Sequence, residues 1–289
     1  MAKKHDIIWF DSVDSTNEEA KRHISDIDNL SVLSALEQTE GRGQRGNTWT
    51  SAPGENLMFS IVMKDLSLPA HDQFVLNEIA SLSVVDFLSQ HGIPARIKWP
   101  NDIYAGSKKI CGILIENSLR GSAVSTSIIG IGLNINQRNF DVILPNPTSM
   151  VLENRSEGSF DLFSCLNDFM DIFKAYVLRF ISAPAASPSD GKASEDLRRM
   201  YLSRLWRLSE TAHFIDYTSL PSGHLDGPMN ISHEGSDSAT PVFAGHSATE
   251  GRKFTGIIRS LSPIGHLQVE DTEKGELKEF AFKEIGYIL

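Results

Sequence analysis

A glycine-rich loop carries the residues of this sequence that are best suited to binding an anion. The stretch TEGRGQRGNTW, residues 39–49, places Arg42 and Arg45 among three glycines and ends at Trp49. Glycine lets the backbone approach a ligand closely, and arginine donates paired hydrogen bonds to carboxylate or phosphate. A tryptophan at the end of such a loop could stack on a base or cover a ring. The same composition is also typical of a solvent-exposed turn, so the rest of the sequence must decide.

The sequence DSTN, residues 14–17, places small polar groups at the expected start of a helix. These residue types are the usual helix N-caps, and they need no further function there. The hydroxyl groups of Ser15 and Thr16 also lie beside free helix N–H groups, where they could hydrogen-bond a polar small molecule. The two interpretations are compatible.

The turn KWPND, residues 98–102, is a third candidate stretch. Pro100 restricts the backbone, so Lys98, Asn101 and Asp102 leave a strand end in defined directions. As a simple β-turn the stretch needs no function. A lysine and a carboxylate that flank such a turn could instead bind a phosphate and a metal ion.

Two adjacent lysines begin the strand-like run KKICGILIEN. Neighbouring strand residues face opposite sides of a sheet, so Lys109 points inward if Lys108 is in solvent. A lysine on the covered side needs an anion, because an unpaired buried charge is costly. Together with the loop arginines and Lys98, it gathers positive charge along the centre of an acidic chain. That arrangement suits a reaction that joins two anions, such as a carboxylate attacking a phosphate.

The composition of the whole chain limits the possible functions. With 289 residues and 40% hydrophobic residues, the chain can form one large domain and a small one. The formal net charge of −10 argues against a broad nucleic-acid surface. We find no signal peptide and no apolar run that could cross a membrane. Cys111 and Cys165 lie in apolar patterns and are expected to be reduced, as in a cytoplasmic protein.

Hydrophobic periodicity predicts a chain of short strands with helices between them. Helix signals include two possible capping boxes, which pair Ser15 with Glu18 and Thr16 with Glu19. The predicted strands cover residues 6–10, 31–38, 56–63, 95–99, 102–106, 108–117 and 124–136. The predicted helices cover residues 14–24, 71–91, 160–181 and 195–206.

The C-terminal part of the sequence changes in character. Residues 182–194 have the composition of a linker, and residues 217–252 are polar and rich in Gly, Ser and His. From Lys253 onward, short alternating runs predict a small barrel of four or five strands. We therefore expect two domains, residues 1–240 and 241–289. The expected fold class is α+β, with a mixed, mainly antiparallel sheet, flanking helices and a C-terminal β barrel.

The motifs DSTN, GRGQRGNTW, KWPNDI, KKICGILIE and GIGLNIN occur in this order over residues 7–136. This set closely resembles the catalytic domain of the biotin protein ligases, or biotin–[acetyl-CoA-carboxylase] ligases. The resemblance implies a class II synthetase-like catalytic domain and a C-terminal SH3-like domain. Some family members carry an N-terminal winged helix and repress transcription. Because this sequence begins at the catalytic strand, it is similar to the single-function class, and we expect no DNA binding.

The resemblance implies a two-step reaction in which biotin and ATP form biotinyl-5′-AMP, and a carrier lysine then takes the biotinyl group. The catalytic residues implied are Lys109, Arg42 and Asp102, with Lys109 between the biotin carboxylate and the α-phosphate. Asp102 would orient or deprotonate the carrier lysine, and Gly130 and Gly132 would let the ring system lie flat on the sheet. The binding residues implied are Ser15, Thr16, Asn17, Gln38, Gly41, Arg42, Gly43, Arg45, Trp49, Lys98, Asn101, Lys109, Gly112, Gly130, Gly132 and Asn134.

The same resemblance implies ATP and Mg²⁺ as cofactors, biotin as substrate and a biotin carboxyl carrier protein as partner. Asn101 and Asn134 are the candidates for contacts with the nucleotide and Mg²⁺. A membrane partner is not expected, and a homodimer is possible. At position 44 this sequence has glutamine where many members of the family have arginine, so its loop holds one cation fewer.

Two alternatives are compatible with parts of the pattern. A lipoate or octanoate ligase or transferase shares the fold and the inward lysine. The combination of Ser15, Thr16 and Gln38 favours biotin, because a purely apolar acyl chain would not need these groups together. A non-catalytic biotin sensor on the same scaffold is the second alternative, and it should lack Lys109 or the loop arginines, which are present here.

Overall fold

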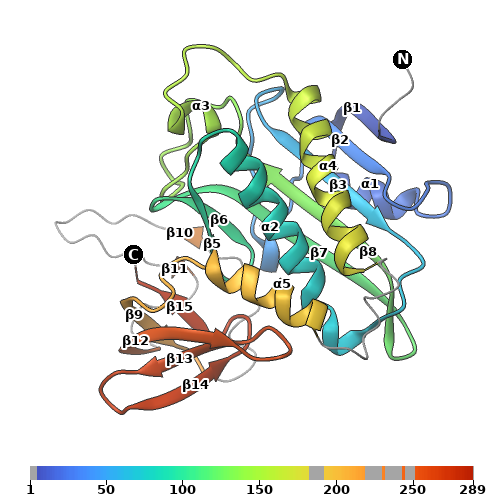
Figure 1. Ribbon diagram of the computed structural model, residues 1–289. Coiled ribbons are helices and arrows are strands. Elements are labelled where there is room, and N and C mark those ends of the chain that lie inside the picture. Colours follow the sequence, from blue (N-terminus) through green and yellow to red (C-terminus); the bar gives the residue numbers. More distant parts are fainter. Residues whose placement is uncertain (1–4, 182–191, 219–229, 232–242, 245–250, 289) are drawn as a thin grey trace.

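The structure is a computed structural model that describes residues 5–181, 192–218, 230–231, 243–244 and 251–288. Its largest element is an eight-stranded mixed sheet with the strand order β1-β2-β3-β8-β7-β6-β5, and β4 pairs with β8 beside this path. A five-stranded antiparallel sheet lies next to it and contains the C-terminal strands (Figure 1). The expected α+β class is confirmed. None of the described helices has the length and apolarity needed to cross a membrane.

The strands of the large sheet follow the predicted runs closely. Only β1 and β2 are parallel, and every other pair in this sheet is antiparallel. The strands are β1 (Ile7–Val13), β2 (Val32–Gln38), β3 (Leu57–Met63), β4 (Leu68–Pro69), β5 (Ala95–Lys98), β6 (Asp102–Ala105), β7 (Lys108–Arg120) and β8 (Ala123–Leu133).

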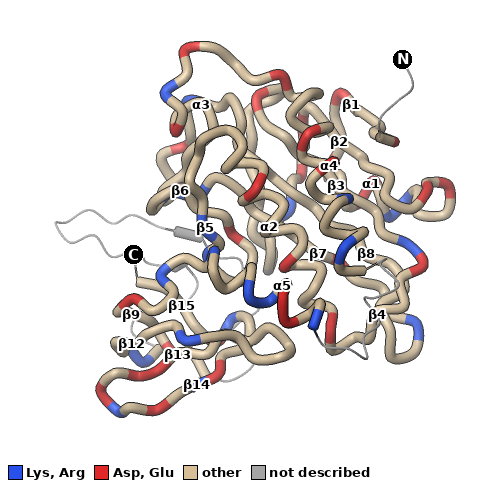
Figure 2. The backbone as a smooth tube through the Cα atoms, in the orientation of Figure 1, with Lys and Arg blue, Asp and Glu red and all other residues tan. Residues whose placement is uncertain are grey.

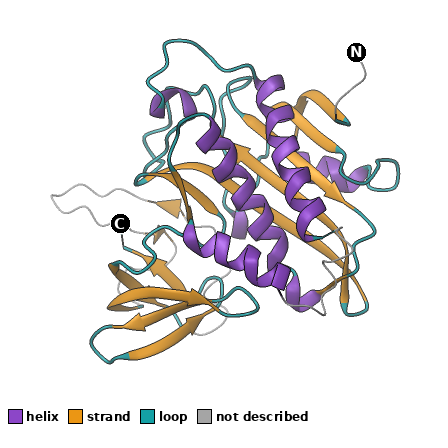
Figure 3. Cartoon of the chain, in the orientation of Figure 1, coloured by secondary structure: helices purple, strands orange, loops and turns teal. Residues whose placement is uncertain are grey.

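Helices cover the large sheet unequally on its two faces (Figure 3). Helices α2 (Phe74–Gln90) and α4 (Leu162–Phe180) pack on one face, and the short helix α1 (Thr16–Arg22) packs on the other. Because strand side chains alternate, Val32 joins the large core under α2, whereas Leu33 packs near α1. The remaining helices are α3 (Met150–Glu153), α5 (Lys192–Ser203), η1 (Gln44–Gly46) and η2 (Ala70–Asp72).

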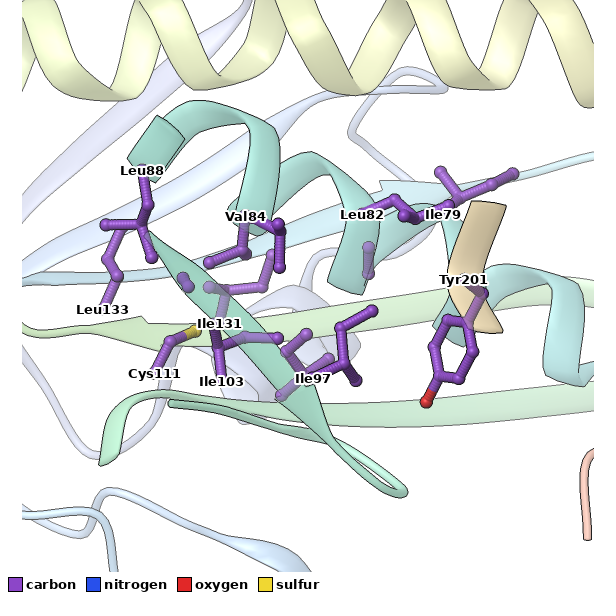
Figure 4. Close-up of a cluster of buried hydrophobic side chains, with 14 of the residues drawn as sticks. Ile79, Leu82, Val84, Leu88, Ile97, Ile103, Cys111, Ile131, Leu133 and Tyr201 are labelled. Atoms are coloured by element: carbon purple, nitrogen blue, oxygen red, sulfur yellow. The ribbon is translucent and has the colours of Figure 1, made fainter. Parts of the chain in front are cut away.

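The main core lies between α2 and the sheet (Figure 4). Isoleucine and leucine side chains from β5, β6 and β8 meet the buried face of α2 there, and Tyr201 of α5 closes one end. Ile129 and Ile131 of β8 belong to this core, so Gly130 and Gly132 necessarily face the α1 side of the sheet. The face that α2 and α4 cover therefore forms the main core. The face that carries α1 is available for a site.

The C-terminal sheet contains β9 (Thr211–Asp216), β12 (Arg252–Leu261), β13 (Leu267–Asp271), β14 (Glu276–Phe280) and β15 (Ile285–Tyr287). Its order is β14-β13-β12-β9-β15. Strand β9 pairs with β12 over its full length, so a boundary at 240/241 would divide one sheet. The predicted boundary misses β9 because a polar stretch separates it from its partner. We propose instead that the C-terminal unit begins before Thr211.

Helix α5 and the turn after β5 hold the two sheets together. Arg198 of α5 donates to the carbonyl groups of Ser262 and Pro263, and the indole of Trp99 donates to the carbonyl of Gly265 at 2.9 Å. Acidic and basic positions are interspersed over both sheets in the view of Figure 2. A hydrophobic cluster runs without interruption from the large sheet into the C-terminal one.

The structure differs from two local predictions. Helix α1 begins after Ser15 as expected, but neither predicted capping box forms, because the Ser15 side chain makes no cap hydrogen bond and Glu18 binds Lys21 and Arg42 instead. Helix α5 begins at Lys192, inside the predicted linker, and residues 182–191 lie outside the described residues. Most of the predicted loop 217–252 also lies outside them, and the short pair β10 (Asn230–Ile231) and β11 (Phe243–Ala244) is what the structure describes there.

Candidate active site

A cavity lies on the α1 face of the large sheet, where β7 and β8 carry glycines. Its enclosed volume is about 50 Å³, well below the roughly 300–1,000 Å³ typical of small-molecule sites, and its mouth is open to solvent. The glycine-rich loop forms its rim, and α1 forms one wall. The lining residues are Ser15, Thr16, Asn17, Gln38, Arg42, Gly43, Gln44, Trp49, Asn101, Asp102, Lys109, Gly112, Ile113, Leu114, Gly130, Ile131 and Gly132.

An ion pair between Lys109 and Asp102 marks one end of the cavity. The Lys109 ammonium lies 2.7 Å from Asp102 Oδ1, and the two side chains are 34% and 23% exposed. Lys108 is exposed, so the predicted inward direction of Lys109 is correct. Burial opposes the charged form of Lys109, but the Asp102 carboxylate outweighs it and raises the lysine pKa above its ordinary value. The cavity therefore contains a permanent cation that already binds a carboxylate.

The other end of the cavity is a network of small polar groups. Gln38 Oε1 accepts hydrogen bonds from the Thr16 backbone N–H at 2.7 Å and from its hydroxyl at 3.1 Å. Because the oxygen is used in this way, the Gln38 amide nitrogen remains available as a donor. The hydroxyl oxygen of Ser60, fully buried in β3, lies 2.6 Å from Asn17 Oδ1 and 2.8 Å from Thr16 Oγ1, and it can donate its one proton to either of them. These contacts fix the orientation of the amide and hydroxyl groups at the cavity floor.

The bare glycine face of β7 and β8 receives side chains of this same chain. A Cβ added to Gly132 would lie 2.3 Å from Trp49 Cε2, and one added to Gly112 would lie 3.0 Å from Trp49 Cζ3. One added to Gly130 would lie 2.4 Å from Asn17 Oδ1. That a ligand ring lies flat on Gly130 and Gly132 stays a prediction, since side chains of this chain occupy their face in the structure. These glycines admit Asn17 and the indole of Trp49, which become walls of the cavity.

The glycine-rich loop is held over the cavity by its own backbone and by two side chains. Gly43 N donates to Asn47 O at 2.7 Å, and Trp49 N donates to Gly41 O at 2.9 Å. Arg42 reaches across to Glu18 of α1, with 2.6 Å between Nη1 and Oε1. Gln44 approaches the Ile113 carbonyl at 3.5 Å, a weak contact. Arg42 thus lines the cavity from the rim, as its predicted role requires.

Of the predicted binding residues whose side chains the structure describes, three do not line the cavity. Gly41 lies in the loop against the Trp49 carbonyl, and the Arg45 side chain lies outside the described part of the chain. The Asn134 amide donates to the Thr148 carbonyl at 2.9 Å, so it braces the segment after β8. Lys98 points toward the C-terminal sheet instead.

Lys98 lies among aromatic rings that connect the two sheets. Its ammonium is 3.0 Å from the Tyr104 hydroxyl, 4.8 Å from the Tyr104 ring centre and 5.2 Å from that of Tyr287. Burial lowers the Lys98 pKa to about 8, and the nearby Asp102 charge opposes that shift. Rings of this kind stabilise an ammonium through their negative faces. Lys98 therefore lies between the two sheets and does not contact the cavity.

Comparison with known proteins bears on this site directly. The profile of the Biotin/lipoate A/B protein ligase family matches residues 9–134, and every residue that lines the cavity falls inside this stretch. Residues 9–134 are thus similar to this family. We refer to them below as the ligase-family domain.

Curated relatives match part of this chain. The Bifunctional ligase/repressor BirA of Bacillus spizizenii is 38% identical over 112 residues, which cover 38% of this chain and 34% of that protein. The Biotin--[acetyl-CoA-carboxylase] ligase of Paracoccus denitrificans is 35% identical over 125 residues, or 42% of this chain and 51% of that protein. The matched part thus spans only about a third to a half of the length of these relatives.

A solved structure extends the similarity to the C-terminal sheet. The biotin protein ligase from Aquifex aeolicus in complex with biotin and ATP has a TM-score of 0.68 and 25% sequence identity, and the match covers 97% of each chain. The fold described above, with the small sheet beside the ligase-family domain, is therefore shared with that protein over nearly its whole length.

Sequence reasoning missed some residues that shape the site of the ligase-family domain. Ser60 is a lone hydroxyl in the otherwise apolar run LMFSIVM, a signal that could have been read. Glu116 of β7 accepts from the Asn17 amide at 2.8 Å, and it follows an equally apolar run. Among the residues that the structure describes, no three His, Cys, Asp or Glu side chains are grouped closely enough to hold a metal ion.

Proposed function

We propose that this chain is a biotin–[biotin carboxyl carrier protein] ligase, which uses ATP to attach biotin to one lysine of a carrier protein. One observation carries the proposal: a single cavity joins the Lys109–Asp102 pair to the polar floor of Thr16 and Gln38. A cation at one end suits an activated carboxylate, and a floor of fixed amide and hydroxyl groups suits a ring with polar edges. The named relatives and the Aquifex aeolicus complex support the same assignment.

In the first step, the biotin carboxylate attacks the α-phosphorus of ATP, a new P–O bond forms, and pyrophosphate leaves. Both reactants are anions, so their repulsion must be screened at the reacting atoms. Lys109 can do this, because its raised pKa keeps it charged and its carboxylate partner, Asp102, lines the same cavity. Arg42 can bind phosphate from the rim, and the Trp49 indole separates the reacting groups from solvent.

In the second step, the ε-amine of the carrier lysine attacks the acyl carbon of biotinyl-5′-AMP, an amide forms, and AMP leaves. The attacking ammonium must first lose a proton. Asp102 is our candidate for orienting or deprotonating it. Once ligand anions bind Lys109, the Asp102 carboxylate is less strongly held and is available to the incoming amine. The partner we propose is the biotin carboxyl carrier protein of a carboxylase such as acetyl-CoA carboxylase.

We propose that a magnesium ion arrives with the nucleotide at the Asp102 end of the cavity. Mg²⁺ is usually bound through one or two carboxylates together with substrate phosphates. Asp102 and the amide oxygen of Asn101 are the oxygen ligands that the cavity offers, since the Asn101 nitrogen already donates to the Ile113 carbonyl at 2.6 Å. These two residues would hold the ion, which would neutralise charge on the phosphates. Asn134 lies too far into the fold to share this role in our proposal.

Lipoate or octanoate transfer remains the competing function within the same family. A measurement of pyrophosphate exchange into ATP separates the two, with biotin, lipoate and octanoate supplied in separate reactions. We expect exchange with biotin and at most a few per cent of that rate with the other acids. Exchange with lipoate or octanoate at the biotin rate or above would refute the assignment. Binding of biotin with no exchange at all would favour a sensor.

A further inference from the structure

A chain of charged side chains connects the rim of the cavity to its floor. Arg42 of the loop binds Glu18 of α1 at 2.6 Å, and Lys21 binds Glu18 at 2.8 Å and Glu116 of β7 at 2.7 Å. Glu116 in turn accepts from the Asn17 amide at 2.8 Å. Arg42 and Asn17, the two ends of this chain, line the cavity, whereas the three members between them do not. The position of the loop and the orientation of the floor amide are therefore joined through residues outside the site.

Glu18 is the member that fixes the loop. Other contacts between the loop and the rest of the domain include the backbone N–H groups of Thr39 and Glu40 on the carbonyls of Val13 and Asp14, the indole of Trp49 on the glycine face and the weak approach of Gln44 to a backbone carbonyl. The Arg42 guanidinium uses only Nη1 for Glu18, so its remaining donors can serve an anion in the cavity. A guanidinium that is held at one edge loses less freedom when its other edge binds a ligand.

We propose that Glu18 is a positioning residue that latches Arg42, and with it the glycine-rich loop, over the activated intermediate. This inference rests on the proposed function and extends it, because it names the residue that retains biotinyl-5′-AMP until the carrier arrives. Glu18 acts through Arg42 and needs no contact with the ligand. Lys21, bound to both Glu18 and Glu116, keeps the Glu18 carboxylate ionised and fixed in place.

The matched control lies one residue further along α1. The Glu19 side chain pairs with Arg22 and His23 and is not part of the cavity lining. The substitutions Glu18→Gln and Glu19→Gln make the same chemical change on the same helix. Only the first removes the charge that faces Arg42.

The test is the dissociation rate of a non-hydrolysable biotinyl-adenylate analogue from the full chain. We expect Glu18→Gln to release it about two- to fivefold faster, the range of an exposed ion pair, and Glu19→Gln to behave as the unmodified protein. In an Arg42→Ala background, Glu18→Gln should have no further effect, because the two residues act as one unit. The difference should also shrink in high salt, which screens the pair.

Equal or slower release from Glu18→Gln, or an undiminished effect without Arg42, would overturn the latch. A second readout is independent of the ligand: amide hydrogen exchange of residues 41–49 should be faster in Glu18→Gln than in Glu19→Gln. If the unmodified protein does not bind the analogue, the proposed function fails, and the exchange comparison alone then decides whether Glu18 holds the loop.

Discussion

Lys108 and Lys109 are neighbours in β7, yet only Lys109 reaches the cavity. This pair allows a test in which the two variants differ only in the face of the sheet they affect. We expect Lys109→Ala to lower the rate of biotin-dependent pyrophosphate exchange by about 100-fold or more, the scale of losing one preorganised group beside a developing charge. Lys108→Ala, which changes an exposed side chain, should keep nearly full activity.

The measurement requires that both proteins are folded, which far-UV circular dichroism and thermal unfolding can establish. Lys109→Ala leaves Asp102 without its partner, so a modest loss of stability is expected as well. Near-normal exchange by a folded Lys109→Ala protein would exclude the role that we assign to this lysine.

Gln44 is the loop residue at which the resemblance to the biotin protein ligases implies an arginine. Its side chain lines the cavity, and Oε1 is buried with no hydrogen-bond partner among the described residues. An arginine here would bring charge-assisted hydrogen bonds, which are roughly twice as strong as neutral ones. We expect Gln44→Arg to slow the release of biotinyl-5′-AMP severalfold with little change in its formation. Stopped-flow chase experiments measure both rates, and unchanged or faster release would contradict the prediction.

At the scale of elements, the glycines of β7 and β8 have a geometric role that can be tested. A Cβ on Gly132 would meet the Trp49 indole at 2.3 Å, so the indole must move in Gly132→Ala. We expect at least a tenfold loss of kcat/KM in biotin transfer and a changed tryptophan emission spectrum. Gly158→Ala is the control, because its new Cβ would meet only Ser156 Oγ, at 3.9 Å. A fully active Gly132→Ala enzyme would show that the position of Trp49 is unimportant.

The bounds of helices and strands were predicted well from the sequence wherever the spacing of apolar residues was regular. Helix α2 and strands β2, β3 and β7 lie close to the predicted bounds because each has an uninterrupted apolar pattern. Strand β9 was missed because its partner, β12, follows it only after a long polar stretch, and no local pattern encodes such a pairing.

The site could be predicted as a set of motifs but not as a set of contacts. Spacing and alternation were enough to place Lys109 on the inner face. They could not show that Asn134 bonds to Thr148 or that Lys98 turns toward Tyr287, since both depend on segments distant in sequence. They also could not show that Trp49 fills the bare glycine face.

At the scale of the whole molecule, a buried charge pair contributes to holding the two sheets together. Glu78 of α2 is fully buried and pairs with Arg198, which also donates to the carbonyls of Ser262 and Pro263 in the turn between β12 and β13. Burial raises the pKa of Glu78 to about 7, and Arg198 offsets only part of that shift. The folded protein thus binds this proton more tightly than the unfolded chain does.

This shift predicts a pH dependence with a definite sign. A carboxyl whose pKa is raised from 4.5 to about 7 contributes its full stability below about pH 4.5 and loses it as the pH rises toward 7. We expect the free energy of unfolding to fall between pH 5 and 8 more steeply in the unmodified protein than in Glu78→Gln, where no proton is exchanged. Parallel pH profiles from chemical denaturation would show that Glu78 does not titrate in this range.

The register between β9 and β12 determines how easily the segment that connects these two strands can be lengthened. Asp216 and Arg252 are direct partners across the two strands, so the chain leaves the C-terminal sheet and re-enters it at adjacent positions. The sheet therefore requires only that the connecting segment be long enough to make a tight turn. It sets no upper limit on the length of that segment. Closing a longer connection costs only about 0.6 kcal/mol for each doubling of its length. This junction is therefore a suitable insertion site. A reporter domain or an affinity tag inserted here should change neither the pairing of the two strands nor the cavity.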